Sequence, residues 1–154
     1  MIRKEVKLPH LVQASQGETV DLGVAKMRLM VEDGVTVDGF SLAEFIGGEG
    51  PWTVPHIHND TEEAFLVLDG RFTFTIDEKE IQVAPGDFLN VPRRTPHVFS
   101  GQAGGGRLLV LWVPGGLEGM FLELARLPAG SIRDRGVRAE ISARYDSVPV
   151  QPPS

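Results

Sequence analysis

The feature that most restricts the fold is a series of short apolar segments, separated by turn residues, between residues 26 and 113. Phe72, Phe74 and Ile76 alternate with polar residues, and this period of two is typical of a strand with one buried face. Residues 64–68 are continuously apolar, which favours a strand buried on both sides. Many short strands bounded by Gly, Pro and Asp favour an all-β antiparallel barrel or sandwich.

The individual strands are expected at these positions: 26–31, 41–46, 64–68, 72–76, 81–83, 88–91, 97–99 and 108–113. Asp69-Gly70 predicts a hairpin turn, because both residues tolerate positive φ. Residues 101–106 predict a loop. Residues 1 to about 25 predict an extended arm with a short strand or two, and residues 149–154 predict an extended tail.

After Pro114 the pattern changes from strand to helix. Apolar residues recur at helical spacing, at Leu117, Met120, Phe121, Leu124 and Ala125. This pattern predicts one amphipathic helix over residues 117–127. The helix either only packs on the barrel or also caps its mouth as a lid. Residues 133–145 predict a second short helix with a charge-balanced, solvated face.

Composition restricts the classes of function. A chain of 154 residues, 42% hydrophobic, suits a single domain over 1–154, with a barrel core of about 26–114 and a C-terminal helical segment of about 117–146. The net charge of −6 gives no basic surface for nucleic acid. No apolar run approaches the roughly 20 residues of a membrane helix, and residues 1–7 lack the apolar segment of a signal peptide. We therefore expect a cytoplasmic protein without nucleic-acid or membrane partners.

Histidine and glutamate are the candidate functional residues, because the chain has no cysteine and any metal must use nitrogen and oxygen ligands. His56 and His58 are two residues apart, so on a strand they point the same way. Glu62 and Glu63 point to opposite faces of the next strand, so only one can join them. With His97, three imidazoles and one carboxylate offer four ligands to a divalent ion. The alternative is a metal-free barrel whose histidines bond only to backbone or water.

Two segments of the chain, residues 50–70 and 86–101, resemble the two motifs of the cupin superfamily. The first motif, G-x5-H-x-H-x3,4-E-x6-G, is filled by Gly50, His56, His58, Glu63 and Gly70. This frame selects Glu63 over Glu62. The second motif, G-x5-P-x-G-x2-H-x3-N, is matched at Gly86, Pro92 and His97, whereas Arg94 and Gly101 stand at its remaining glycine and asparagine positions.

The resemblance implies a cupin jelly-roll barrel with one or two short C-terminal helices. It also implies one divalent transition metal ion (iron, manganese, nickel, cobalt, copper or zinc), held by His56, His58, Glu63 and His97. Arg94, in place of the motif glycine, is expected to affect the turn before His97.

Further segments resemble the small single-barrel cupins related to quercetin 2,3-dioxygenase. These segments are residues 62–70, 114–118 and 143–145, with Pro152-Pro153. The likeness implies a metal-dependent dioxygenase that cleaves a flavonol, or a related enol or 1,3-dicarbonyl compound, with O2. Glu63 would then be both a ligand and the general base that accepts the substrate's hydroxyl proton. The alternatives are a non-redox isomerase, cyclase or lyase, and a non-catalytic protein that binds a small molecule.

The substrate pocket of such a barrel should be mainly apolar. The candidate wall residues are Phe65, Phe74, Phe99, Trp112, Met120 and Phe121. For each of them, a place in the plain core is the favoured alternative. Exposed strand edges favour a homodimer.

Overall fold

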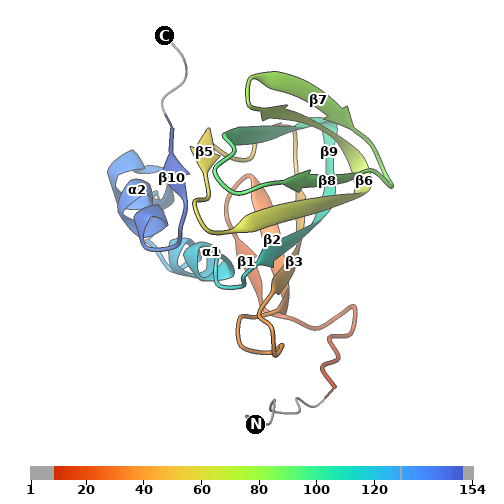
Figure 1. The fold of residues 1–154 in the computed structure, drawn as a ribbon, viewed down its shortest axis with the longest axis vertical. Helices are drawn as coiled ribbons and strands as arrows, with labels where there is room; N and C mark the ends of the chain where they lie inside the picture. The colour runs from red at the N-terminus through yellow and green to blue at the C-terminus, as the bar shows by residue number, and fades with distance from the viewer. Residues whose placement is uncertain (1–8, 129, 151–154) are drawn as a thin grey trace.

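The computed structural model describes residues 9–128 and 130–150 (Figure 1). Its strands are β1 (Thr19–Asp21), β2 (Ala25–Val31), β3 (Ser41–Gly47), β4 (Gly50–Pro51), β5 (His56–Ile57), β6 (Glu62–Ile76), β7 (Lys79–Val83), β8 (Phe88–Val91), β9 (His97–Val113) and β10 (Val148–Pro149). Its helices are α1 (Glu118–Ala125), the 3-10 turn η1 (Ser131–Arg133) and α2 (Arg135–Ala143). The predictions for residues 1–8 and 151–154, including Pro152-Pro153, lie outside the described residues.

Two long antiparallel strands form the centre of the fold. β6 pairs with β9 from Glu62 opposite Val113 to Ile76 opposite His97. On the other side of β9, β3 pairs with its C-terminal half, and β4 and β5 pair with its N-terminal half. On the other side of β6, β8 pairs with its beginning and β7 with its end. The two halves of β6 and β9 thus belong to two halves of one continuous sheet.

One half of the sheet has the order β1-β2-β3-β9-β6-β8, and the other half has β7-β6-β9 followed by β4 and β5, with β10 beside β5. All of these pairings are antiparallel. The all-β jelly-roll barrel predicted from the sequence is therefore confirmed, with its two short C-terminal helices.

The predicted turn at Asp69-Gly70 and the predicted loop at 101–106 are both wrong, because β6 and β9 run through these residues. Gly70 has a φ of 73° and lies between two register shifts in the pairing of β6 with β9. A Cβ atom at Gly70 would lie 2.0 Å from the carbonyl oxygen of Gly105. The glycines therefore allow two strands to bend while crossing closely, and they do not reverse the chain.

The other regular elements follow the sequence pattern. The predicted strands at 26–31, 41–46, 81–83 and 88–91 correspond to β2, β3, β7 and β8. The predicted helices correspond to α1 and α2. α2 begins after Asp134, whose side chain accepts hydrogen bonds from the backbone N–H groups of Gly136 and Val137. Such a side-chain cap satisfies N–H groups that have no partner within the helix.

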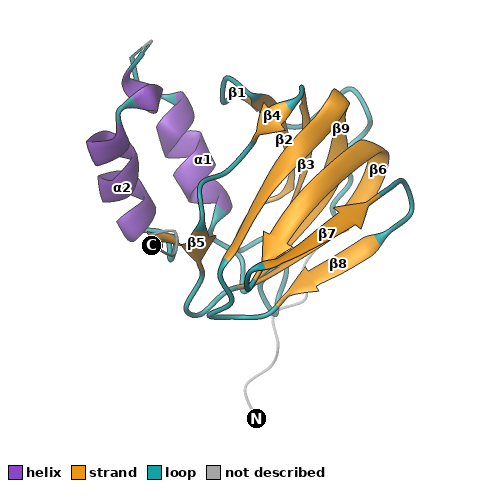
Figure 2. Ribbon diagram, turned by 90° about the horizontal axis from the view of Figure 1, so that it is seen from above, coloured by secondary structure: helices purple, strands orange, loops and turns teal. Residues whose placement is uncertain are grey.

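The helices lie together on one side of the strands, next to β5 and β10 (Figures 1 and 2). Met120 and Leu124 of α1 are buried in the core. Phe121 packs edge-on against Phe45 of β3 and stacks near Trp112 of β9, with ring centroids 5.2 and 5.8 Å apart respectively. Each buried apolar side chain contributes roughly 1.5–3 kcal/mol, so α1 is held to the barrel mainly by this apolar contact. No helix in the described part of the chain is long and apolar enough to cross a membrane.

Candidate metal centre

The four residues predicted as ligands meet inside the barrel. His56 of β5 lies directly opposite His97, the first residue of β9, while His58 follows β5 and Glu63 is near the start of β6. All four side chains are buried. One potential ligand atom from each residue lies within 4.8 Å of those of the others. Residues from three separate segments thus form one buried cluster of three imidazoles and a carboxylate.

The backbone fixes the orientation of each imidazole. The Nδ1 atoms of His56, His58 and His97 lie 2.7, 2.8 and 2.9 Å from the carbonyl oxygens of Val54, Asp146 and Thr95 respectively. A carbonyl oxygen only accepts, so each Nδ1 carries the hydrogen and donates it. In the neutral imidazoles, the lone pair therefore lies on Nε2.

Glu63 is held by a tryptophan. The indole Nε1 of Trp112, on the β9 residue paired with Glu63, donates to Glu63 Oε2 at 2.5 Å. Oε1 of Glu63 lies 3.1 Å from Nε2 of His97 and 3.7 Å from Nε2 of His58. One carboxylate oxygen is thus engaged by the indole, and the other faces the imidazoles as a single ligand atom.

Burial and mutual contact change the protonation of the cluster. Burial, reinforced by nearby His97, lowers the pKa of His56 to about 4. Burial alone would raise the pKa of Glu63, but the contacts with His58 and His97 hold it below its ordinary range. Burial likewise opposes protonation of His58, whereas Glu63 and Asp146 together raise its pKa. Glu63 therefore stays ionised near neutral pH, and His56 stays neutral.

A metal ion fits this donor set. Nε2 of His58 is buried and has no hydrogen-bond partner among the described residues, and leaving such an atom unsatisfied is costly in a folded protein. Two ligands of one ion with bonds of about 2.1 Å lie roughly 3–4 Å apart. The 3.1 Å between His97 and Glu63 falls in this range, while the widest separation of 4.8 Å requires a small inward movement. The four residues could hold one divalent ion.

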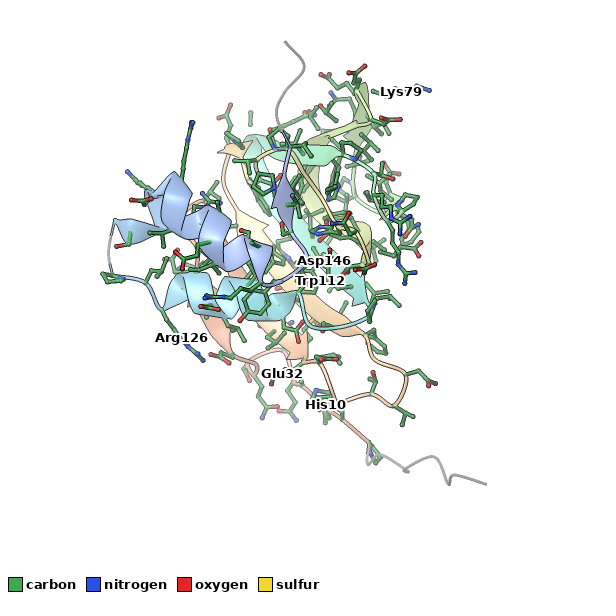
Figure 3. The ribbon with its side chains drawn as sticks, turned by 60° about the vertical axis from the view of Figure 1, so that its left-hand side comes forward. His10, Glu32, Lys79, Trp112, Arg126 and Asp146 are labelled. Carbon is green, nitrogen blue, oxygen red and sulfur yellow. The ribbon has the colours of Figure 1, made fainter. Side chains whose placement is uncertain are left out.

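Asp146 supports the cluster from the end of the chain, between α2 and β10 (Figure 3). Its carbonyl oxygen accepts from His58, and its carboxylate accepts from the N–H groups of Asn59 and Asp60 and the hydroxyl of Thr61, at 2.8–2.9 Å. The C-terminal segment therefore fixes both a candidate ligand and the loop that carries it. Neither this residue nor the Trp112 donor was predicted, because both contacts depend on pairings that the sequence does not show.

Arg94 stands at the glycine position of the second motif and keeps a glycine-like backbone. Its φ of 62° lies in the left-handed region. Its N–H donates to the carbonyl oxygen of His58 at 2.7 Å. The predicted effect of Arg94 on the turn is thus limited to backbone strain, and the turn still brings His97 to the cluster.

The cluster opens into a cavity of about 600 Å³. Five of the six predicted wall residues line it: Phe65, Phe99, Trp112, Met120 and Phe121. Phe74 does not line it, because this side chain is fully buried in the core and stacks on Phe99 with ring centroids 4.8 Å apart. Since Met120 and Phe121 belong to α1, this helix forms one wall of the cavity. Its movement as a lid stays a prediction.

Comparison with known proteins agrees with this fold. Residues 42–114 match the cupin domain. The chain is 31% identical over 115 residues to quercetin 2,3-dioxygenase of Bacillus subtilis, covering 75% of this chain and 34% of that protein. It is 40% identical over 57 residues to an uncharacterized protein of Methanocaldococcus jannaschii, covering 37% and 46% respectively. The chain thus spans about a third of the length of the Bacillus subtilis protein and under half of the Methanocaldococcus jannaschii protein.

Solved structures give the same fold. KdgF from Halomonas sp. superposes with a TM-score of 0.60 at 14% identity, over 68% of this chain and 93% of that one. The polyketide cyclase RemF from Streptomyces resistomycificus superposes with a TM-score of 0.59 at 24% identity, over 68% and 79% respectively. The protein is a cupin.

Proposed function

We propose that this cupin is a metal-dependent dioxygenase that cleaves a flavonol, or a related enol or 1,3-dicarbonyl compound, with O2. The observation that carries the proposal is the buried cluster of three oriented imidazoles and one carboxylate, which opens into a large, mainly apolar cavity. The similarity to the Bacillus subtilis dioxygenase supports oxygen chemistry over other uses of such a cluster.

His56, His58, Glu63 and His97 would hold the ion. When bound, a divalent transition metal supplies a Lewis acid that makes a substrate hydroxyl more acidic, and a centre for oxygen chemistry. Each Nδ1 hydrogen is given to a carbonyl oxygen, so each histidine would bind the ion through Nε2, which must be free of its proton.

Glu63 is the proton acceptor in this proposal. Its Oε2 is occupied by Trp112 and its Oε1 faces the metal site, so Glu63 would have to swing partly off the ion to take up a substrate proton at Oε1. A carboxylate is a weak base, so it accepts a proton most readily from an acidic hydroxyl. An enol or flavonol hydroxyl satisfies this condition better than an ordinary alcohol, which supports the substrate class.

The cavity walls would position the rest of the substrate. Phe45, Phe121 and Trp112 present aromatic surfaces beside the cluster, and planar aromatic substrates pack well on such surfaces. The same walls exclude water from the reacting carbon atoms.

The experiment begins with elemental analysis of protein purified without added metal, followed by oxygen-uptake assays with a flavonol and an aryl 1,3-diketone. We expect His56→Ala to lose the metal, and Glu63→Gln to keep metal at reduced affinity but lose oxygen uptake. His10→Ala is the matched control, because His10 bonds to the carbonyl oxygen of Met30 outside the cluster.

Three results would redirect the assignment. Full metal content in His56→Ala would contradict the ligand set. Conversion of substrate without oxygen uptake would favour the non-redox isomerase, cyclase or lyase. Tight binding without any turnover would favour a binding protein.

The homodimer and the cytoplasmic location stay predictions. β8 is an edge strand in the described sheet, and its Phe88 is 67% exposed, which supports the proposal of a paired surface. Sedimentation analysis of wild type and Phe88→Ser would test the dimer.

A further inference from the structure

The cavity has a second polar region besides the metal-ligand cluster. Arg133 of η1 and Arg138 of α2 line it, together with Ser142 of α2. The cluster residues, by contrast, come from the barrel. The C-terminal helical segment therefore adds positive charge to a cavity that is otherwise mainly apolar.

The two arginines have no partner of their own. Among the described residues, neither guanidinium group forms a hydrogen bond or an ion pair. Arg28, Arg107 and Arg144, by contrast, each lie within 4 Å of a glutamate carboxylate. The chain has 21 acidic and 15 basic residues, so acidic partners are in excess. Arg138 is nevertheless half-buried without one.

We propose that Arg133 and Arg138 bind a carboxylate on the substrate, at the end that does not reach the metal-ligand cluster. The planar guanidinium group presents parallel N–H donors that match the two oxygens of a carboxylate. The substrate class is then an aromatic or similarly apolar enol that also carries a carboxylate. The enol part of this inference rests on the proposed function, whereas the carboxylate part rests on the arginines alone.

The cavity dimensions agree with such a molecule. Its volume of about 600 Å³ lies within the range of roughly 300–1,000 Å³ found for small-molecule sites. Phe121 and Met120 of α1 line the same cavity, so the cavity also offers apolar surface to the body of such a molecule. A neutral flavonol would leave both arginines without a counterion.

The test uses two probes that differ in charge and by one methyl group, 4-(3-oxobutanoyl)benzoate and its methyl ester. Both carry a 1,3-dicarbonyl group at one end of an aromatic ring, and only the first has a carboxylate at the other. Binding to zinc-loaded protein is measured by titration calorimetry without oxygen. We expect the acid to bind at least about tenfold more tightly than the ester, or about 1.4 kcal/mol, with a preference that weakens as salt rises.

The double variant Arg133→Gln/Arg138→Gln should lower the acid-to-ester preference to about one and leave binding of the ester unchanged. The double variant with lysine at both positions should keep part of the preference, because charge remains without the planar fork. Arg135→Gln is the matched control: Arg135 is exposed on the same helix but does not line the cavity.

Equal affinities for acid and ester in the wild type would overturn the inference, as would failure of both probes to bind. A preference that survives in the double glutamine variant, or that is lost equally in Arg135→Gln, would also overturn it. The outcome is separable from that of the proposed function. Absence of oxygen uptake with an intact preference rejects only the dioxygenase, and oxygen uptake without the preference rejects only the carboxylate site.

Discussion

Replacing Asp146 with asparagine tests whether the C-terminal segment holds the candidate metal centre in place. Asp146 has a φ of 57°, and asparagine is among the residues that best tolerate this left-handed conformation. The substitution therefore keeps the backbone and the carbonyl that accepts from His58. It removes the charge and one acceptor oxygen from a carboxylate that receives three hydrogen bonds.

The magnitude follows from these three contacts. An amide oxygen placed toward Asp60 and Thr61 would keep two of them in weaker, uncharged form. The amide nitrogen would then face the N–H of Asn59, so the third hydrogen bond is lost. A hydrogen bond to a charged group is worth about 1.5–3 kcal/mol and a neutral one about 0.5–1.5 kcal/mol. Because Asp146 is partly exposed and screened by solvent, we expect a net loss of about 2 kcal/mol.

Denaturant unfolding of metal-free protein and metal titration measure the two consequences. We expect Asp146→Asn to lower the free energy of unfolding by about 2 kcal/mol, and to weaken metal binding by roughly 10–100-fold, the usual effect of losing a partner of a ligand. Burial would raise the pKa of Asp146, but its hydrogen bonds to residues 59–61 lower it below 3.8. The stability difference should thus be present above pH 3.8 and disappear as the pH falls through the lowered pKa.

Asp134→Ala is the control, because Asp134 caps α2 without contacting the ligand loop. It should cost about 1 kcal/mol with unchanged metal affinity. Wild-type metal affinity in Asp146→Asn, or equal losses in both variants, would refute the idea that Asp146 acts on the metal centre.

Three further predictions concern the cluster and its second motif. Trp112→Phe removes the donor to Glu63 and should weaken metal binding about tenfold, measured by competition with a chelator. Because the pKa of His56 is lowered from 6.5 to about 4, metal-free protein should lose about 3 kcal/mol of stability as the pH falls from 6.5 to 4, and His56→Gln should lose this dependence. Arg94→Gly should raise the free energy of unfolding by about 0.5–1 kcal/mol, because it relieves the positive φ, whereas Arg93→Gly should lower it.

The unfolded chain protonates His56 below pH 6.5, while the folded chain resists until about pH 4, so acid favours unfolding in that interval. His58 has a raised pKa and contributes its dependence above 6.5 instead. A flat stability profile between pH 6.5 and 4.5 would contradict the burial of neutral His56, and equal metal affinity in Trp112→Phe would contradict the role of the indole.

Three of the four candidate ligands could be predicted because they lie close together in the sequence. His56 and His58 lie close together because they are two positions apart in one segment, and Glu63 follows five residues after His58. His97 was placed by its motif, and the structure pairs it directly with His56. Strands β2, β3, β7 and β8 could also be predicted, because the apolar pattern that indicates each strand lies within that strand's own residues.

The bends in β6 and β9 could not be predicted in this way. A glycine with positive φ serves a hairpin or a bulge equally well, and only its partner strand decides between them. Gly70 pairs with Gly106, and the carbonyl oxygen of Gly105, 35 positions away in sequence, lies too close to Gly70 for any side chain there. Local turn propensity therefore predicted an end to each strand where the barrel requires its continuation.

The residues that support the ligands could not be predicted either, because their contacts join segments that are distant in sequence. Trp112 was predicted as a wall residue because it is large and apolar. Its hydrogen bond to Glu63 depends on the register of β9 against β6, which the sequence does not show. Asp146 lies 88 positions from His58, beyond two helices. The barrel alone therefore supplies the ligands, but their orientation depends on how the C-terminal segment returns to it. A truncation after α1 would keep all four ligands but remove Asp146. We therefore expect it to lower the affinity for a metal.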